Sequence, residues 1–345
     1  MANLAELDQF DAVTLTGIIR LRPPKWSLFS TFFAPQAPSE TDMFELHTTV
    51  QGDSVIPSVT KNSAGVMRQP DAWSIGVVRA PRFRTKRAFQ AADVIARRQL
   101  GRNPYETEAD PVARVVAEDM DAHRRDHDRM IEIMCAQAAV TGKVTLYDMD
   151  NATLTEAFSV DYKRPESHEI TVAAEDYWSI DTVDLYKQIE EANRLIQEDA
   201  DGMSATDIIM GADAFAAFRR HPDVVDSMKL DYAMGTGELP MQIAQLQKGH
   251  WDGLRVWCYS GTYKDLDGTV KHYIDPKDAL LVAKGAESVI EYGRPLDLDC
   301  AGATQYFVKQ YKQDDPSGIF TVAESRPLPV TRHAGWAVHF VGVVK

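Results

Sequence analysis

Five basic residues lie within nine positions of a chain that is acidic overall. The protein has 345 residues and a formal net charge of −14, yet the stretch VRAPRFRTKRAF, residues 78–89, contains Arg79, Arg82, Arg84, Lys86 and Arg87. Guanidinium and ammonium groups at this density can bind phosphate groups or carboxylates. This stretch, here called the basic strip, is therefore a candidate contact for nucleic acid, a phosphorylated ligand, a membrane surface or an acidic face of another copy of the chain.

The charge is distributed unevenly along the chain, which bears on the choice among these partners. Residues 1–105 contain 13 Lys and Arg and 9 Asp and Glu, whereas residues 106–345 contain 24 and 42. A nucleic-acid site would interleave its cations with exposed aromatic rings, and Phe83 and Phe89 fit that pattern. The acidic later residues would repel phosphate, but they would complement a strip that docks on copies of the same chain. The sequence favours such copies as the partner and leaves a nucleic-acid-binding module as an alternative.

Two histidines and an aspartate recur at four-residue intervals in a predicted helix. Asp119, His123 and His127 would share one helix face, a spacing that can present two imidazoles and a carboxylate to a divalent metal. Arg124 and Arg125 flank the set, and no further strong ligand can be named. We interpret these residues as a solvated helix face and keep a metal-dependent enzyme as the second alternative.

Other catalytic patterns are missing from the sequence. Ser260 lies in CYSGT rather than in a GxSxG turn, and the three cysteines, Cys135, Cys258 and Cys300, are far apart and form no CxxC pair. We therefore expect no catalytic residue, no bound metal and no cofactor. The first residues lack the basic flank and apolar run of a leader peptide, and no uncharged stretch is long enough to span a bilayer.

The clearest predicted element is a long helix over residues 111–141. Asp110 suits the N-cap, Pro111 the first helical position, and Gly142 the position just past the end. At about 1.5 Å per residue the helix would be about 46 Å long. Apolar residues mark its two ends and the middle is polar all round, which predicts a strut anchored at its ends.

Two segments before this helix cannot form a core of their own. Residues 20–40 combine four prolines with aromatic residues, which predicts an extended arm packed on a neighbouring subunit or on the chain's own body; the expected inter-subunit anchors are Trp26, Phe29, Phe32 and Phe33. Residues 44–90 alternate in polarity between turn signals, which predicts a long two-stranded excursion. A lone hairpin is marginal in water, so we expect this excursion to lie on another surface.

The remaining chain predicts an α+β body divided into two folding units. A second helix over residues 182–202 would be capped by Asp181 and ended by Gly202, and TDIIMG would be a short buried strand. Residues 254–274 predict a hairpin whose turn contains Asp267 and Gly268, both with positive φ. Near the end of the chain, Pro327 and Pro329 suit edge strands.

The order of these parts resembles the tailed-phage major capsid proteins of the Hong Kong 97 fold, and most closely the lambda-type branch, the phage major capsid protein E family. Six stretches carry the resemblance, from about residue 30 to the end: FFAPQAPSETDMFEL, PSVTKNSAGVMRQPDAWSIGVVRAP, RDHDRMIEIMCAQAAVTGKVTL, DIIMGADAFAAFRRHPDVVD, RVWCYSGTYKDLDGTVKHYIDPKDALLV and FTVAESRPLPV. They are similar to the family's arm, extended loop, spine helix, axial-domain strand and helix, axial hairpin and closing strand.

The resemblance implies a non-enzymatic structural protein with a defined division of the chain. Residues 1–45 match the N-terminal arm, 46–90 the extended loop, 91–178 and 300–345 the peripheral domain with the spine helix, and 179–299 the axial domain. Pentamers and hexamers would tile an icosahedral shell in the virion, first as a precursor that then expands. The excursion and the arm would then rest on neighbouring subunits, and the basic strip would meet their carboxylates.

The resemblance also implies partners and a place of assembly. The expected partners are copies of the chain, a separate scaffolding protein, a portal and a decoration protein at three-fold positions. The shell would enclose double-stranded DNA without reading its sequence, and it would assemble in the host cytoplasm without a membrane. Some relatives cross-link a loop lysine to a neighbour; Lys61 suggests that chemistry, but no partner asparagine or acid can be assigned.

Overall fold

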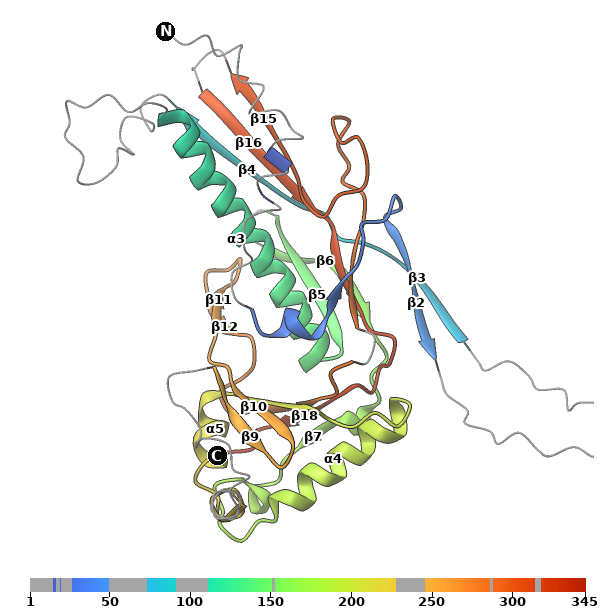
Figure 1. Ribbon diagram of the computed structural model, residues 1–345, viewed down its shortest axis with the longest axis vertical. Helices are drawn as coiled ribbons and strands as arrows, with labels where there is room; N and C mark the ends of the chain where they lie inside the picture. Colours follow the sequence, from blue (N-terminus) through green and yellow to red (C-terminus); the bar gives the residue numbers. More distant parts are fainter. Residues whose placement is uncertain are drawn as a thin grey trace, which may run out of the picture. The chain divides into compact units, whose positions relative to one another are not determined.

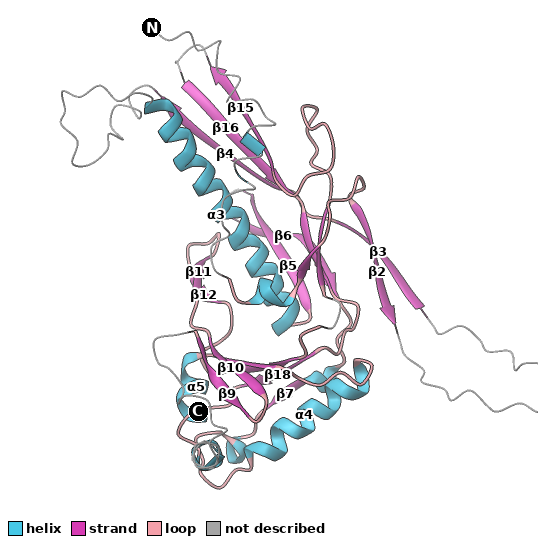
Figure 2. Cartoon of the chain, in the orientation of Figure 1, coloured by secondary structure: helices cyan, strands magenta, loops and turns pink. Residues whose placement is uncertain are grey.

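The computed structural model describes residues 15–16, 19, 27–49, 73–90, 111–150, 153–227, 246–285, 288–313 and 318–345. The chain divides into two compact units (Figure 1). Unit 1 comprises residues 1–44, 79–133 and 289–329, and unit 2 comprises residues 45–78, 134–288 and 330–345. Both helices and sheets are present, which confirms the predicted α+β class (Figure 2).

One three-stranded sheet of unit 1 is antiparallel and has the order β15-β16-β4. Its strands are β15 (Phe307–Gln313), β16 (Gly318–Ser325) and β4 (Phe83–Gln90). The register pairs Lys86 with Val322 and Arg84 with Glu324, so one basic and one acidic residue meet directly across the two strands. The basic strip is thus joined by a full ladder to a strand more than 200 residues later in the chain.

The long predicted helix is present as α3 (Pro111–Val140). It begins at the predicted proline, and Gly142 beyond its end has a φ of +66°, a conformation that glycine adopts without strain. Asp110, the predicted N-cap, lies outside the described residues. The helix contributes residues up to Ile133 to unit 1 and the remainder to unit 2.

Two further sheets include the strands next to and within the predicted excursion. One has the order β1-β14-β17, with β1 (Ala34–Pro35), β14 (Val289–Tyr292) and β17 (Pro327–Val330), so the proline-containing β17 is an edge strand as predicted. The other pairs β2 (Met43–Thr49) with β3 (Trp73–Arg79), which confirms the two strands of the excursion. Residues 50–72 between them, with Lys61, lie outside the described residues.

Unit 2 is built on a six-stranded mixed sheet of order β7-β18-β13-β8-β10-β9. The strands are β7 (Glu169–Thr171), β18 (Ala337–Val341), β13 (Ala279–Val282), β8 (Asp207–Met210), β10 (Leu254–Cys258) and β9 (Gln247–Trp251). Every residue of β8 and β13 is buried, as expected for central strands.

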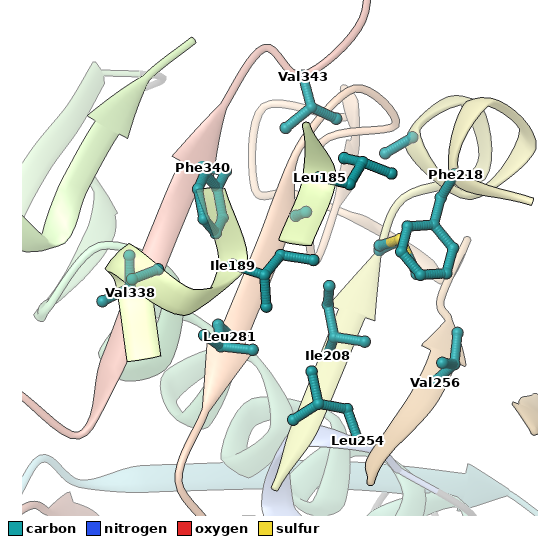
Figure 3. Close-up of a cluster of buried hydrophobic side chains, with 14 of the residues drawn as sticks. Leu185, Ile189, Ile208, Phe218, Leu254, Val256, Leu281, Val338, Phe340 and Val343 are labelled. Atoms are coloured by element: carbon teal, nitrogen blue, oxygen red, sulfur yellow. The ribbon is translucent and has the colours of Figure 1, made fainter. Parts of the chain in front are cut away.

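Two helices complete the core of unit 2, α4 (Leu185–Asp199) and α5 (Ala212–Phe218). Figure 3 shows Leu185 and Ile189 of α4 pointing toward the same apolar cluster as Ile208, Leu281 and Phe340 of the sheet. The α5 helix starts immediately after Gly211, where a Cβ atom would collide with the backbone of Asp275 and Pro276. The absence of a side chain there permits the turn from β8 into α5.

The remaining elements of unit 2 are short or hairpin-like. They comprise the paired strands β5 (Lys143–Asp150) and β6 (Thr153–Asp161), the paired strands β11 (Thr262–Lys264) and β12 (Val270–His272), and the 3₁₀ turns η4 (Glu166–His168) and η5 (Ala174–Asp176). Unit 1 contains a further 3₁₀ turn, η3 (Phe29–Phe32).

Two local predictions for unit 2 were wrong. The N-cap of α4 is Asp184, whose carboxylate accepts a hydrogen bond from Lys187 N at 3.0 Å, because turns occupy the chain from Trp178 to Val183 and delay the helix. In the β11–β12 hairpin only Gly268 has a positive φ. Asp267 instead accepts hydrogen bonds from Thr269, so a longer loop replaces the predicted two-residue turn.

The structure also shows the state of the cysteines and the character of the described helices. All three cysteines carry free thiols. Among the helices that the structure describes, none has the length and apolar character needed to cross a bilayer.

Candidate functional site

Arg84 and Lys86 of the basic strip lie on the exposed side of strand β4. Side chains at residues 84, 86, 88 and 90 are exposed, while those between them are half-buried or buried, and Arg82 just before the strand is exposed as well. This alternation follows from the two-residue period of a strand. Arg82, Arg84 and Lys86 therefore face the same side.

Glu324 of β16 is the common partner of the first two arginines. Its side chain is 1% exposed, and one oxygen accepts hydrogen bonds from Arg82 Nη2 at 2.7 Å and from Arg84 Nη1 at 3.1 Å. Its other oxygen accepts the backbone N–H of Leu296 at 2.7 Å. The hydrogen bond to Glu324 raises the pKa of Arg82. A carboxylate this deeply buried needs both guanidinium groups to compensate its lost hydration.

A second carboxylate extends this network on the same sheet. Asp297 lies 3.3 Å from Arg84 Nη2 and 2.8 Å from Lys309 Nζ, and Lys309 also reaches Asp299 at 3.0 Å. Burial opposes ionisation of Asp297, but the hydrogen bonds from Lys309 and the Asp299 N–H outweigh it and lower its pKa. The loop that carries Leu296 and Asp297 is therefore held to the strip through charged groups.

Lys86 has a different environment from the arginines. Its ammonium lies 4.1 Å from the ring centroid of Phe320 and 5.4 Å from that of Tyr311, and these rings are stacked with centroids 5.1 Å apart. Within the described residues no carboxylate lies at ion-pair distance from Lys86. Its charge therefore remains available to a partner on the exposed side of the sheet, beside the 41% exposed Tyr311.

The two outer members of the strip also bind carboxylates of their own subunit. Arg79 Nε lies 3.2 Å from Asp42, and Arg87 Nη2 lies 2.7 Å from Asp126. Four of the five cations of the strip thus have partners within the chain, a pattern that sequence reasoning did not anticipate. Contact of the strip with carboxylates of a neighbouring subunit stays a prediction.

The histidine face of α3 is buried, so the prediction of a solvated strut was wrong. Asp119, His123 and His127 are 4%, 0% and 2% exposed. The Thr85 hydroxyl lies 2.7 Å from His123 Nδ1 and 3.4 Å from His127 Nε2, and the Thr321 hydroxyl lies 3.1 Å from His123 Nε2. Strands β4 and β16 therefore cover the part of the helix that is polar in sequence.

This arrangement keeps the imidazoles neutral and places their ring nitrogens beside threonine hydroxyl groups. Burial is the main cause that lowers the pKa of His123 and of His127 to about 4, and the positive charge of Arg87 adds to the effect at His123. In the part of the chain that the structure describes, no three His, Cys, Asp or Glu side chains are grouped so that they could hold a metal ion.

The aromatic N-terminal segment packs against its own unit. Phe29, Phe32 and Phe33 are 0%, 7% and 2% exposed. The backbone N–H groups of Phe29 and Ser30 donate to the two carboxylate oxygens of Glu132 on α3 at 2.8 and 2.9 Å. The packing thus follows the second of the two placements that the sequence allowed. Trp26 lies outside the described residues, and contact of these aromatic residues with a neighbouring subunit stays a prediction.

Glu132 is the residue that fixes this segment, and the sequence offered only an indirect signal for it. Burial raises the pKa of Glu132, while the N–H groups of Ser30 and Phe29 act against that rise. Its neighbours Ile131 and Ile133 are apolar and buried. A single acid within such a run is the kind of position that needs a buried partner, but nothing in the sequence identifies the partner.

The sequence and the fold can now be compared with known proteins. The family model for phage major capsid protein E matches residues 11–341. The chain belongs to the phage major capsid protein E family. It is therefore a structural protein of the virion that associates with copies of itself into an icosahedral shell. No curated protein sequence matches it.

Solved structures of similar fold include further capsid proteins. A protein described as the capsid protein of a prophage of E. coli CFT073 is 19% identical with a TM-score of 0.70, covering 96% of this chain and 98% of that chain. A phage-related protein from Bordetella bronchiseptica RB50 is 13% identical with a TM-score of 0.56, covering 96% and 97%. The mature capsid of bacteriophage PhiM1 contains a chain that is 14% identical with a TM-score of 0.51, covering 92% and 88%. These likenesses confirm the predicted Hong Kong 97 type of fold.

Proposed function

We propose that this capsid protein forms the shell around double-stranded DNA without binding that DNA through the basic strip. The observation that carries the proposal is the intramolecular pairing of Arg82 and Arg84 with Glu324. Guanidinium groups already held by a buried carboxylate are poor ligands for phosphate, because binding would leave that carboxylate unpaired. The net charge of −14 further disfavours retention of packaged DNA on the shell.

The contacts between subunits are the second part of the proposal. We infer that residues 46–90, the extended loop, rest on a neighbouring subunit, and that the arm with Trp26, Phe29, Phe32 and Phe33 strengthens the same contact. Because the three phenylalanines are buried in their own unit, they would do so by holding the arm in place. Arg79, Arg82, Arg84, Lys86 and Arg87 would lie at its rim. Lys86 supports this role most directly, since its exposed charge contacts only aromatic rings within the described residues.

Family membership supports the remaining parts of the proposal. The peripheral domain would comprise residues 91–178 and 300–345, and the axial domain residues 179–299. Assembly would occur in the host cytoplasm on a separate scaffolding protein, around a portal, with a decoration protein at three-fold positions. The chain would act without catalysis and without a cofactor.

A DNA-retention assay on shells and free subunits tests the role of the strip. Free subunits should bind no DNA at physiological salt, and shells from the parent chain and from the Lys86→Glu variant should be equally resistant to loss of DNA. Salt-sensitive binding of DNA by free subunits that Lys86→Glu abolishes, with shell formation unchanged, would instead favour the nucleic-acid module.

A further inference from the structure

The two ends of the β2–β3 segment are held side by side in unit 1. Asp42 immediately precedes β2 and Ala80 immediately follows β3. The N–H of Ala80 donates to the carbonyl of Asp42 at 2.8 Å, and Arg79 Nε lies 3.2 Å from the Asp42 carboxylate. The segment therefore leaves and rejoins unit 1 at one place, here called the root, formed by Asp42, Arg79 and Ala80.

One buried guanidinium binds both ends of the root. Arg326 Nη2 donates to the Asp42 carboxylate at 3.1 Å and to the Ala80 carbonyl at 2.9 Å. The Arg326 side chain is only 2% exposed, whereas Asp42 is 27% exposed. A single side chain thus bridges residues on opposite sides of the excursion, and it does so where water cannot replace it.

The backbone around Arg326 is fixed from several directions. Arg326 lies between β16 and β17, so a strand constrains the chain on each side of it. Its carbonyl accepts the N–H of Gly293 at 2.9 Å, and Nη1 donates to the carbonyl of Arg294 at 3.3 Å. A Cβ at Gly293 would lie 3.3 Å from Cα of Asp42, so the root approaches this turn closely. The guanidinium consequently has little freedom to move with the root.

We propose that Arg326 is a positioning residue for shell assembly, which ties the residue before β2 to the residue after β3 and thereby sets the direction in which residues 43–79 leave unit 1. The inference rests on the proposed contact between this segment and a neighbouring subunit. A segment that must reach a fixed place on another subunit assembles more readily when its direction is set beforehand, because less conformational entropy is lost on contact.

The chemistry of the side chain explains why arginine fits this role. The planar guanidinium presents several N–H groups in fixed directions and stays charged in proteins. The Lys ammonium is a compact point charge on a flexible stem, so it could keep the ion pair with Asp42 while losing the simultaneous contacts with the two carbonyls. Arg326→Lys therefore removes the bridge and keeps the charge.

The test measures the freedom of the segment in the unassembled full chain. Spin labels are placed at residue 77 on β3 and residue 88 on β4, both exposed, after Cys258 is replaced by Ser. Pulsed electron paramagnetic resonance then reports the distribution of distances between them. We expect one narrow distance distribution in the parent chain and a broad one in Arg326→Lys and in Asp42→Asn. The circular dichroism spectrum should be the same in all three.

Glu40→Gln is the matched control. Glu40 also precedes β2 and pairs with Arg294 Nη1 at 3.1 Å, but its contacts with Arg294 and with the N–H of Ala303 do not include the β3 end. This variant should keep the narrow distance distribution of the parent. If Arg326→Lys fails to fold, the result for Asp42→Asn tests the proposal, because Asp42 is partly exposed and its substitution disturbs the fold less.

A narrow distribution like that of the parent in every folded variant of Arg326 and Asp42 would overturn the proposal.

Shell formation by the same variants separates the inference from the proposed function. Arg326→Lys and Asp42→Asn should yield folded subunits but few closed shells, whereas Glu40→Gln should yield shells as the parent does. A variant with a broadened distance distribution that still yields as many closed shells as the parent would overturn the positioning role. If the parent chain forms shells in which residues 43–79 contact no neighbouring subunit, the proposed function is contradicted. The distance measurement would then still show whether Arg326 fixes the root.

Discussion

At the scale of single residues, Lys86 is the cation of the basic strip that can bind a neighbouring subunit without breaking an ion pair among the described residues. Lys86→Glu should lower the yield of shells and leave the unfolding temperature of the free subunit nearly unchanged, because only a cation–π contact of about 0.5–1 kcal/mol is lost. Electron microscopy and thermal denaturation measure the two effects. Lys312→Glu makes the same charge change at another exposed position of the sheet and should leave the shell yield unchanged. An equal loss of shell yield in both variants would mean that the net charge of the subunit, not the basic strip, controls assembly.

Arg84 makes a different prediction because its partners are inside the subunit. Arg84→Glu would place a third carboxylate beside Glu324 and Asp297, so we expect the free subunit itself to lose about 1–3 kcal/mol of stability. Denaturant unfolding of the free subunit measures this loss. Unchanged stability would mean that the network around Glu324 does not form in solution.

The buried histidines predict a pH dependence of stability. In the folded state the pKa of His123 and of His127 is about 4, below the ordinary 6.5, so the unfolded chain binds more protons between these values. Stability should therefore fall as the pH drops from 6.5 toward 4, by on the order of 3 kcal/mol for each imidazole once both are protonated. Denaturant unfolding as a function of pH measures this slope.

Variants separate these imidazoles from other titrating groups. His123→Gln combined with His127→Gln should flatten the slope between pH 6.5 and 4, even if the variant is less stable at neutral pH. His272→Gln, at an exposed position on β12, should keep the slope of the parent. An unchanged slope in the double variant would contradict the buried neutral state of the two imidazoles.

At the scale of elements, the N-terminal segment belongs to the core of unit 1. Deletion of residues 1–38 would remove the buried Phe29, Phe32 and Phe33 and leave Glu132 without its two backbone donors. We therefore expect a loss of several kcal/mol, since each buried aromatic side chain contributes about 1.5–3 kcal/mol. Thermal denaturation of the truncated chain measures this loss, and full stability after deletion would show that these contacts form only between subunits.

The same elements show how far local sequence signals reach. The bounds of α3 were predictable, because Pro111 and Gly142 act on the backbone next to them. The burial of its polar middle was not, because the covering residues Thr85 and Thr321 come from strands far away in the chain. The cap of α4 was misplaced by three residues, since two aspartates compete there and only the packing of the preceding turn selects Asp184.

The candidate surface shows the same limit at side-chain level. The alternation in VRAPRFRTKRAF is enough to place Arg82, Arg84 and Lys86 on one face, because that placement depends only on the period of a strand. Their partners Glu324 and Asp297 could not be predicted, because the ladder that brings β16 beside β4 is a tertiary pairing. A net count of charges therefore could not show that carboxylates of the same chain pair with four of the five cations, and contact with a neighbouring subunit stays a prediction.

At the scale of the whole molecule, the account states that copies of this chain form a closed shell. Electron microscopy of the full-length protein, expressed alone and with the proposed scaffolding protein, tests this most directly. We expect capsomers and closed particles with five-fold and six-fold positions, because the fold belongs to a family whose members build such shells. A protein that remains a uniform monomer at every concentration, with and without scaffold, would contradict the account.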